Sequence, residues 1–516
     1  MARCFGIDTA RDALAGGKPA LIWRKQVADT ETPVSAALKL MESERGDFLL
    51  ESVEGGETRG RHSLIGLAPD LVFRADGEKA EINSHWLTDR DAFAPTDQDS
   101  LSALRTLVST CQMEVPEELP RALACLVGYF GYETIGLVEK LPRAPQSELE
   151  LPDMLFVRPT VILIFDRLAD ELFLVAPVWP EADGDVEARI ALAMERLDEV
   201  ERQLDEPIRS SRAKPVETTS KQSDSTSLGA TAIEFTPHLP PRKYQDMVLR
   251  AKDYIEAGDI FQVVLAQRFT TPFGLPPIEL YRALRRINPS PFLFFLDLPG
   301  FAITGSSPEI LVRARDGEIT IRPIAGTRPR GTNVAEDKAN KESLLADPKE
   351  RAEHLMLLDL GRNDVGRVAT ANSVEVTDSY TVEFYSHVMH IVSNVIGELA
   401  PDKDAIDALF AGFPAGTVSG APKVRACEII AELEPETRGA YAGGVGYFSP
   451  DGSMDSCIVL RTGIVKDGVL HVQAGAGIVA DSDPAYEQAE CEAKSGALLA
   501  AAKEAVKRAQ DLSFGQ

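Results

Sequence analysis

Two short stretches indicate the fold and chemistry of this chain: residues 349–364, KERAEHLMLLDLGRND, and residues 475–494, GAGIVADSDPAYEQAECEAK. Each contains paired acidic residues at helical spacing, with a lysine after the second pair: Glu350, Glu353, Glu487, Glu490 and Lys494. Residues i, i+3 and i+7 share one helix face, and like charges there repel unless a cation or a basic group lies between them. Carboxylate oxygens suit Mg²⁺ or Ca²⁺. The pattern predicts a divalent-cation site between two helices, or two solvated helix faces.

Composition narrows the class of partner. The 516 residues include 54 basic and 80 acidic side chains, for a net charge of −26. Such a surface repels nucleic acid and anionic membranes, so neither is an expected partner. An anion site in this chain therefore needs local lysine, arginine, backbone amides or a metal.

The cysteines and the apolar runs predict a cytoplasmic protein. No CxxC pair occurs, so neither a zinc site nor a redox pair is expected, and the thiols should be reduced. The first residues lack the apolar run of a signal peptide, and no run approaches the ~20 residues that span a bilayer.

Residues 210–230, SSRAKPVETTSKQSDSTSLGA, divide the chain. This segment cannot bury enough apolar surface to offset its ordering entropy, and we expect a linker between a domain of residues 1–209 and one of residues 231–516. The N-terminal part mixes strand-like runs with helical stretches, which indicates α+β. The strand-like runs are residues 47–52, 124–129, 157–165 and 171–176, and the helical stretches are residues 33–44, 100–111 and 185–204.

The C-terminal part begins with a helical pattern over residues 240–257 and a strand over residues 262–269. Three Asp-Gly pairs, at 316–317, 451–452 and 467–468, are hairpin signals because each lies between strand-like runs. The fold class predicted is α+β, with large, mostly antiparallel sheets flanked by helices.

Several further residues are candidates for binding an anion. Residues 414–423, PAGTVSGAPK, could leave backbone amides free at a helix N-terminus, or form an ordinary turn. Residues 475–477, GAG, expose backbone before the second acidic helix, although strand glycines also mark bends. His390 is either a core residue or a functional one. Arg461 interrupts an apolar strand and needs an anionic partner, which is either a glutamate or a substrate carboxylate.

Residues 235–505 resemble the chorismate-utilising enzymes, and among them the large components of anthranilate synthases. Six segments in the family order carry the resemblance: GSSPE at 305–309, PIAGTRPRG at 323–331, AEHLMLLDLGRND at 352–364, PAGTVSGAPK at 414–423, GGVGYFS at 443–449 and GAGIVADSDPAYEQAECEAK at 475–494.

The resemblance implies roles for individual residues. Glu353 and Glu490 would bind Mg²⁺ with support from Glu350 and Glu487, and the ion would hold the ring carboxylate of chorismate. Further contacts to chorismate would come from Gly326, Thr327, Thr417, Tyr441, Arg461, Gly475, Gly477 and Lys494. Glu309 resembles the general acid that protonates the departing C4 hydroxyl. His390 matches the histidine linked to pyruvate elimination.

Two positions distinguish the branches of this family. At the position of Ala325, aminodeoxychorismate synthases of this family characteristically carry a nucleophilic lysine. At the position of Gln262, isochorismate and salicylate synthases carry a lysine that acts as a base. Neither residue here can act in that way, so the resemblance implies amination by ammonia, giving anthranilate and pyruvate in the first step of tryptophan biosynthesis. The chain has no GxCxGxQ-like glutaminase motif, so ammonia would come from a separate amidotransferase subunit or from ammonium, and a hetero-oligomer is expected. The alternatives are another chorismate enzyme, or a tryptophan-binding protein without catalysis.

The N-terminal part resembles the regulatory portion of the same family, through LLES at 49–52 and RGRHS at 59–63, with NPSPFLFF at 288–295. The resemblance implies a tryptophan feedback site; a simple contact between domains is the alternative. Phe292 and Leu293 replace the tyrosine or methionine found in similar sequences and keep the wall apolar. The residues implied are Glu51, Ser52, Pro289, Ser290, Pro291 and Phe292.

Overall fold

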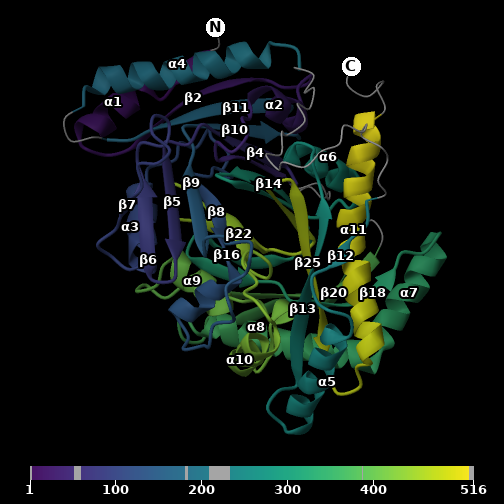
Figure 1. Ribbon diagram of the computed structural model, residues 1–516. Coiled ribbons are helices and arrows are strands. Elements are labelled where there is room, and N and C mark those ends of the chain that lie inside the picture. Colours follow the sequence, from purple (N-terminus) through teal and green to yellow (C-terminus); the bar gives the residue numbers. More distant parts are fainter. Residues whose placement is uncertain (1–2, 52–59, 181–183, 209–232, 386–387, 511–516) are drawn as a thin grey trace.

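The computed structural model describes residues 3–51, 60–180, 184–208, 233–385 and 388–510. The predicted linker at 210–230 and Ser52 lie outside them. Within these ranges the chain forms two large antiparallel sheets with helices around them, which confirms the α+β prediction (Figure 1). None of the helices in these ranges combines the length and apolar character that crossing a bilayer requires.

The first sheet has 13 strands in the described residues. Their order is β1 (Cys4–Phe5), β2 (Ala20–Val27), β11 (Glu171–Val178), β10 (Val161–Asp166), β4 (His62–Leu67), β3 (Asp47–Glu51), β14 (Phe292–Leu298), β15 (Phe301–Ser307), β24 (Thr462–Lys466), β25 (Val469–Ile478), β13 (Gln262–Pro272) and β12 (Thr236–Pro237), with β21 (Gly420–Ala421) also on β13.

The second sheet has 12 strands in the same part of the chain. Their order is β18 (Ile324–Pro329), β20 (Val388–Glu398), β17 (Glu318–Ile321), β16 (Ile310–Arg315), β23 (Met454–Ile458), β22 (Gly444–Phe448), β8 (Leu126–Phe130), β9 (Met154–Arg158), β5 (Leu71–Asp76), β6 (Lys79–Asn83) and β7 (Ala94–Pro95), with β19 (Glu375–Phe384) also on β20.

Helices cover the outer faces and the ends of the sheets (Figure 1). The α-helices are α1 (Ile7–Ala15), α2 (Pro33–Leu40), α3 (Ser100–Thr110), α4 (Val186–Leu204), α5 (Lys243–Glu256), α6 (Pro277–Ile287), α7 (Val334–Ala346), α8 (Pro348–Gly366), α9 (Ala405–Gly412), α10 (Lys423–Leu433) and α11 (Pro484–Gln510). Two short 3₁₀ helices are η1 (Tyr132–Leu137) and η2 (Gly416–Val418).

Strand β10 shows why the first sheet is buried on both faces. Side chains alternate across a strand, so Ile162 and Ile164 face the core between the two sheets. Leu163 and Phe165 face the opposite way, into the core under α1, α2 and α4. The strand is therefore apolar from Val161 to Phe165, as expected of a strand covered on both sides.

The three Asp-Gly hairpin predictions are confirmed. The pairs connect β16 to β17, β22 to β23 and β24 to β25, all antiparallel. At 316–317 and at 467–468 both residues have positive φ, the conformation of the two-residue turns that match strand twist. These turns return the chain between neighbouring strands and bring residues of the site from different parts of the sequence together.

Strands from both sides of the predicted linker share both sheets. In the first sheet β3 pairs with β14, and Leu293 lies opposite Glu51. In the second, β22 pairs with β8, and Gly446 lies opposite Gly128. The division into domains at 1–209 and 231–516 stays a prediction, but it does not coincide with a boundary between the sheets.

Candidate active site

The glutamate pairs of the two acidic stretches lie in the first two turns of α8 and α11. Asp347 caps α8 by accepting hydrogen bonds from the backbone of Lys349 and Glu350. Asp483 similarly accepts from the backbone amides of the first turn of α11. Each helix begins with proline, which suits a first turn because it lacks the N–H that would be left unpaired there. The glutamate pairs therefore lie at helix N-termini, where the helix dipole favours negative charge.

The structure brings the glutamates of α8 and α11 close enough to affect one another. Burial raises the pKa of Glu353, and the charges of Glu350 and Glu490 raise it further. Burial also raises the pKa of Glu487, with a further contribution from Glu490. The positive charges of Lys349 and Lys494 oppose both shifts. Negative charge is thus concentrated between the two helices.

Lys494 connects the glutamates of α8 and α11 to β25. Its Nζ lies 2.7 Å from Glu490 Oε1 and donates a 2.9 Å hydrogen bond to the carbonyl of Gly475. In the described residues no three histidine, cysteine or acidic side chains already gather in ligating positions. Glu353 and Glu490 nevertheless fit a hard divalent cation, because they are oxygen donors whose mutual repulsion such an ion would relieve.

A bulge in β18 fixes His390 on the neighbouring strand β20. Gly326 has φ of +68°, and the register shifts between Ala325 and Thr327. The shift turns the carbonyl of Gly326 toward His390, whose Nδ1 lies 2.8 Å from that oxygen and 3.1 Å from Thr327 Oγ1. A carbonyl only accepts, so Nδ1 carries the proton and Nε2 holds a lone pair in the neutral ring. Burial lowers the pKa of His390, which favours this neutral form.

The absence of a side chain at Gly326 also allows Glu350 to lie next to this bulge. A Cβ at Gly326 would lie 3.0 Å from Glu350 Oε2 and 3.0 Å from Leu344 Cδ1. Glu350 Oε1 accepts a 3.0 Å hydrogen bond from Arg328, further along the same strand. The glutamates of α8 and the histidine of β20 therefore flank one strand, β18.

Glu309 is a buried carboxyl group between β15 and β16. Thr417 Oγ1 lies 3.2 Å and 3.1 Å from its two carboxyl oxygens. Burial raises the pKa of Glu309 to about 8, although hydrogen bonds from Thr417 and from the backbone of Ile324 lower it. The group is therefore protonated at neutral pH and can donate a proton. Ile324 begins β18, so Glu309 reaches the strand that also holds His390.

Gly475 and Gly477 line a narrow part of the site on β25. A Cβ at Gly475 would lie 2.9 Å from Tyr441 Oη, and one at Gly477 would lie 2.5 Å from Gln262 Nε2. Any side chain at these positions would displace those groups. The buried Oε1 of Gln262 has no hydrogen-bond partner among the described residues, so one acceptor beside Gly477 is left unsatisfied by the protein.

Arg461 lies outside the strand in which the sequence placed it. It precedes β24 in the left-handed conformation, with φ of +48°, and is half-buried. Its charge lowers the pKa of His390, which places its field at the same site. The turn, not an apolar strand, explains how a charged residue is accommodated there.

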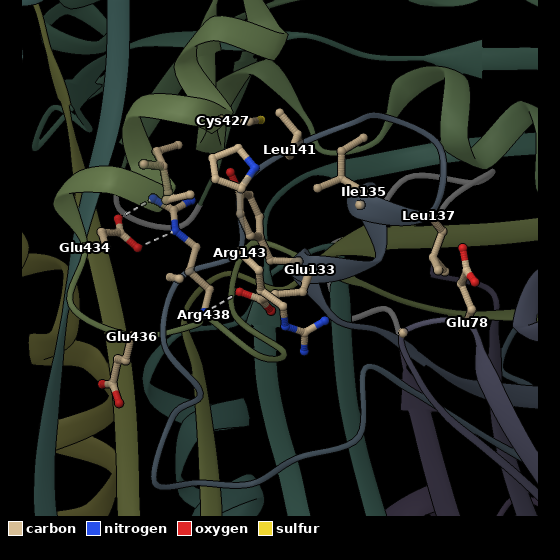
Figure 2. A pocket seen from close by; sticks show the side chains of 17 residues that line it. Glu78, Glu133, Ile135, Leu137, Leu141, Arg143, Cys427, Glu434, Glu436 and Arg438 are labelled. Carbon is tan, nitrogen blue, oxygen red and sulfur yellow. Dashed lines mark hydrogen bonds and ion pairs between the residues drawn. The ribbon is translucent and has the colours of Figure 1, made fainter.

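One buried ion pair behind this site was missed by sequence reasoning. Arg438 Nη2 and Nε bond Glu434 at 2.5 and 2.8 Å (Figure 2). The same guanidinium donates to the carbonyls of Val264, on β13, and Val418, beside Thr417. It also lies 5.7 Å from the ring centroid of Tyr441. Arg438 thus connects β13, which holds Gln262, with the segments of two predicted substrate contacts, Thr417 and Tyr441, and no spacing in the sequence predicts this.

The outer side of this ion pair borders a cavity of about 200 Å³ between η1 and α10. Glu133 lines it and accepts backbone hydrogen bonds from Arg438 and Gly439, at 2.7 and 3.0 Å (Figure 2). Burial raises the pKa of Glu133 to about 7. Both glutamates therefore position Arg438, one through its side chain and the other through its backbone.

A second cavity, of about 240 Å³, lies between the two sheets. Of the residues predicted for tryptophan, Glu51, Pro291 and Phe292 line it, and Pro289 and Ser290 precede that wall. The carboxylate of Glu51 is bound by Tyr281, Arg285 and Arg167. The opposite wall was not predicted as part of this site; it comprises Arg313, Val445, Tyr447, Asp455 and Cys457.

Comparison with known proteins agrees with this geometry. The family model for chorismate binding enzymes matches residues 46–500. Anthranilate synthase component 1 of Cereibacter sphaeroides is 50% identical over 489 residues, covering 95% of each chain. The protein of the same name from Thermus thermophilus is 46% identical over 476 residues, covering 92% of this chain and 96% of its own.

Solved structures give the same result. Anthranilate synthase component I from Streptococcus pneumoniae superimposes with a TM-score of 0.72 at 35% identity, covering 92% of this chain and 99% of its own. The menaquinone-specific isochorismate synthase from Escherichia coli shares the fold, with a TM-score of 0.67 at 19% identity, 96% of this chain and 99% of its own. The chain therefore belongs to the chorismate binding enzymes, and within them to the family of anthranilate synthase component 1.

Proposed function

We propose that the chain is the aminating subunit of an anthranilate synthase, which converts chorismate and ammonia into anthranilate and pyruvate. The observation that carries the proposal is the buried Glu309, whose pKa of about 8 keeps it protonated beside Thr417. A proton donor of this kind suits loss of the C4 hydroxyl of chorismate, which departs as water. His390, neutral and with Nε2 unprotonated, suits removal of a ring proton when pyruvate is later eliminated.

The chain would bind the enolpyruvyl carboxylate of chorismate at the narrow part of the site. Arg461 supplies the charge, Tyr441 a hydroxyl, and Gly475 and Gly477 approachable backbone. Gly326, Thr327 and Thr417 would contact the ring from β18 and η2, and Lys494 from α11. Because these groups come from both sheets and from α11, they can fix the ring between Glu309 and His390.

Glu353 and Glu490 would hold Mg²⁺, with Glu350 and Glu487 supporting them. The ion would supply positive charge to the ring carboxylate, which makes an acidic site able to receive an anion. The support for this assignment is the raised pKa of Glu353 and of Glu487, since like charges have been brought together across α8 and α11.

The choice of nucleophile follows from Ala325 and Gln262. Ala325 is buried in β18 beside Gly326 and offers no amine to attack the ring. Gln262 is buried against Gly477 and is a poor base for activating water. Ammonia needs no such activation, so amination at C2 is the reaction these residues favour. The related enzymes that carry a lysine at one of these positions would form other products.

Ammonia would come from glutamine through a separate amidotransferase, the component 2 that the name component 1 implies for the relatives. Free ammonium would replace that partner in vitro. The cavity between the sheets would receive tryptophan as a feedback inhibitor. Its apolar walls include Pro291, Phe292 and Tyr447, and its volume of about 240 Å³ suits an amino acid with an indole side chain.

Incubation of the purified chain with chorismate, Mg²⁺ and ammonium tests the proposal. Anthranilate fluorescence should appear, should depend on ammonium, and should fall when tryptophan is added. Glu309→Gln serves as the matched control, since it keeps the shape of the side chain and removes the acid. Formation of isochorismate or salicylate, or no turnover, would refute the proposal.

A further inference from the structure

The cavity between the sheets is lined by residues that adjoin both candidate catalytic residues, Glu309 and His390. Pro308 and Ile310, which flank Glu309 in sequence, line the cavity. Ile324, which precedes the bulge that fixes His390, lines it as well. A molecule in this cavity would therefore contact the backbone segments that position Glu309 and His390.

Tyr385 gives a more direct connection. Its side chain lines the cavity, and its ring meets the ring of His390 edge-on, with 5.4 Å between centroids and 65° between planes. Tyr385 Oη donates a 3.0 Å hydrogen bond to Glu383 Oε2. Glu383 Oε1 in turn accepts a 2.6 Å hydrogen bond from Arg322, which also lines the cavity. Two cavity residues thus converge on one glutamate.

Glu383 is also placed against His390. The two residues are opposite one another in the pairing of β19 with β20, and the charge of Glu383 raises the pKa of His390. In the described part of the chain, His390 also interacts with the carbonyl of Gly326 and the hydroxyl of Thr327, on β18, and with the charge of Arg461 before β24. Tyr385 and Glu383 act on the ring from the β19 side.

We propose that Tyr385, held by Glu383 and Arg322, is the positioning residue through which an occupant of the cavity acts on His390. The inference rests on the proposed function, because it deepens the regulation of that same site. An amino acid with an aromatic side chain would contact Tyr385 and Arg322, shift the ring of Tyr385, and so turn His390 away from the hydrogen bond to Gly326. Packed aromatic pairs prefer a few discrete arrangements, so a small shift of one ring changes the orientation of the other.

A substitution of Tyr385 should therefore separate the binding of tryptophan from its effect on catalysis. Typical coupling between two sites changes affinity or activity 5- to 150-fold. In Tyr385→Leu, the dissociation constant of tryptophan, measured calorimetrically without chorismate, should change by no more than about threefold. Inhibition of anthranilate formation at saturating tryptophan should fall from at least about tenfold to less than about twofold. Without inhibitor, kcat should fall while KM for chorismate stays nearly constant.

Two further variants serve as controls. Tyr385→Phe keeps the ring and removes only the hydroxyl, so it should recover most of kcat and of the inhibition. Tyr447→Leu alters the same cavity on the opposite wall, without contact to His390. It should weaken tryptophan binding and inhibition in parallel, so that saturating tryptophan still inhibits.

The outcomes separate the inference from the proposed function. A wild-type chain that forms no anthranilate refutes the proposed function. An active wild-type chain whose Tyr385→Leu variant is inhibited as strongly at saturating tryptophan refutes only the inference. Loss of tryptophan binding in step with inhibition in that variant, with kcat unchanged, also refutes it, because Tyr385 would then be a binding contact alone.

Discussion

The contact between Thr417 and Glu309 gives a quantitative prediction. Thr417→Val preserves the shape of the side chain and removes the hydroxyl that lies 3.1 and 3.2 Å from the two carboxyl oxygens. The hydroxyl has one proton, so it makes one hydrogen bond to the ionised carboxylate at a time. A hydrogen bond to a charged group contributes about 1.5 kcal/mol. One pKa unit corresponds to about 1.4 kcal/mol, so the loss should raise the pKa of Glu309 by about one unit.

The sign follows from the role of Glu309 as an acid. The protonated form is active, so the rate falls as pH rises through the pKa, which is about 8 in the wild-type chain. In Thr417→Val the ionised form has lost its donor, so the alkaline limb of the kcat/KM profile, which reports the pKa values of the free enzyme, should move to about pH 9, whatever the change in absolute rate.

The assay is initial anthranilate fluorescence against pH, with the concentration of unprotonated ammonia held constant. Thr417→Ser keeps the hydroxyl and is the matched control, so its alkaline limb should stay near that of the wild-type chain. An unmoved limb in Thr417→Val, or an equal movement in Thr417→Ser, would contradict the assignment of Glu309 as the titrating acid.

Three other substitutions test separate parts of the structure. Glu490→Gln should abolish turnover even at high Mg²⁺ while tryptophan still binds; activity retained at the Mg²⁺ concentration that suffices for the wild-type chain would exclude this residue as a ligand. Arg438→Met leaves Glu434 buried without its partner, so urea unfolding should show a loss of about 3–5 kcal/mol in the free energy of unfolding, and most of it should return when Glu434→Leu is added. Gly326→Ala forces alanine to φ of +68°, which costs about 1–2 kcal/mol, and should reduce kcat by displacing His390; unchanged thermal stability and rate would show that the bulge tolerates a side chain.

Much of the fold could be predicted from local pattern. The Asp-Gly turns and the 3.6-residue periodicity of α5 depend on neighbouring residues only, and the structure confirms both. Residues 157–165 were predicted as a single strand, but β9 ends at Arg158 and β10 begins at Val161. Pro159 interrupts the run because proline lacks the N–H that a central strand needs. Which strands pair across the linker was not predictable, because pairing depends on contacts far apart in sequence.

In the site too, local pattern predicted some features and contacts distant in sequence determined the others. The spacing of the glutamates predicted two helix faces, and in the structure Glu490 of α11 lies near enough to Glu353 of α8 to raise its pKa; the cation site between them stays a prediction. The resemblance supplied the candidates Glu309 and His390, but their protonation depends on burial, on the carbonyl of Gly326 and on Thr417. Arg438 and Tyr385 act through tertiary contacts alone, so no motif could have identified them.

The pairing of β3 with β14 and of β8 with β22 has a consequence for how such a chain can be recombined. A recombinant that exchanged the first 208 residues between two relatives would have to match two strand seams as well as the cavity that lies beside the first of them. Inhibitor recognition could then not be transplanted as a cassette. Sensitivity to feedback would instead be altered by single substitutions along the pairing of β3 with β14, at positions such as Phe292 and Leu293. The two parts of the chain would then be inherited together.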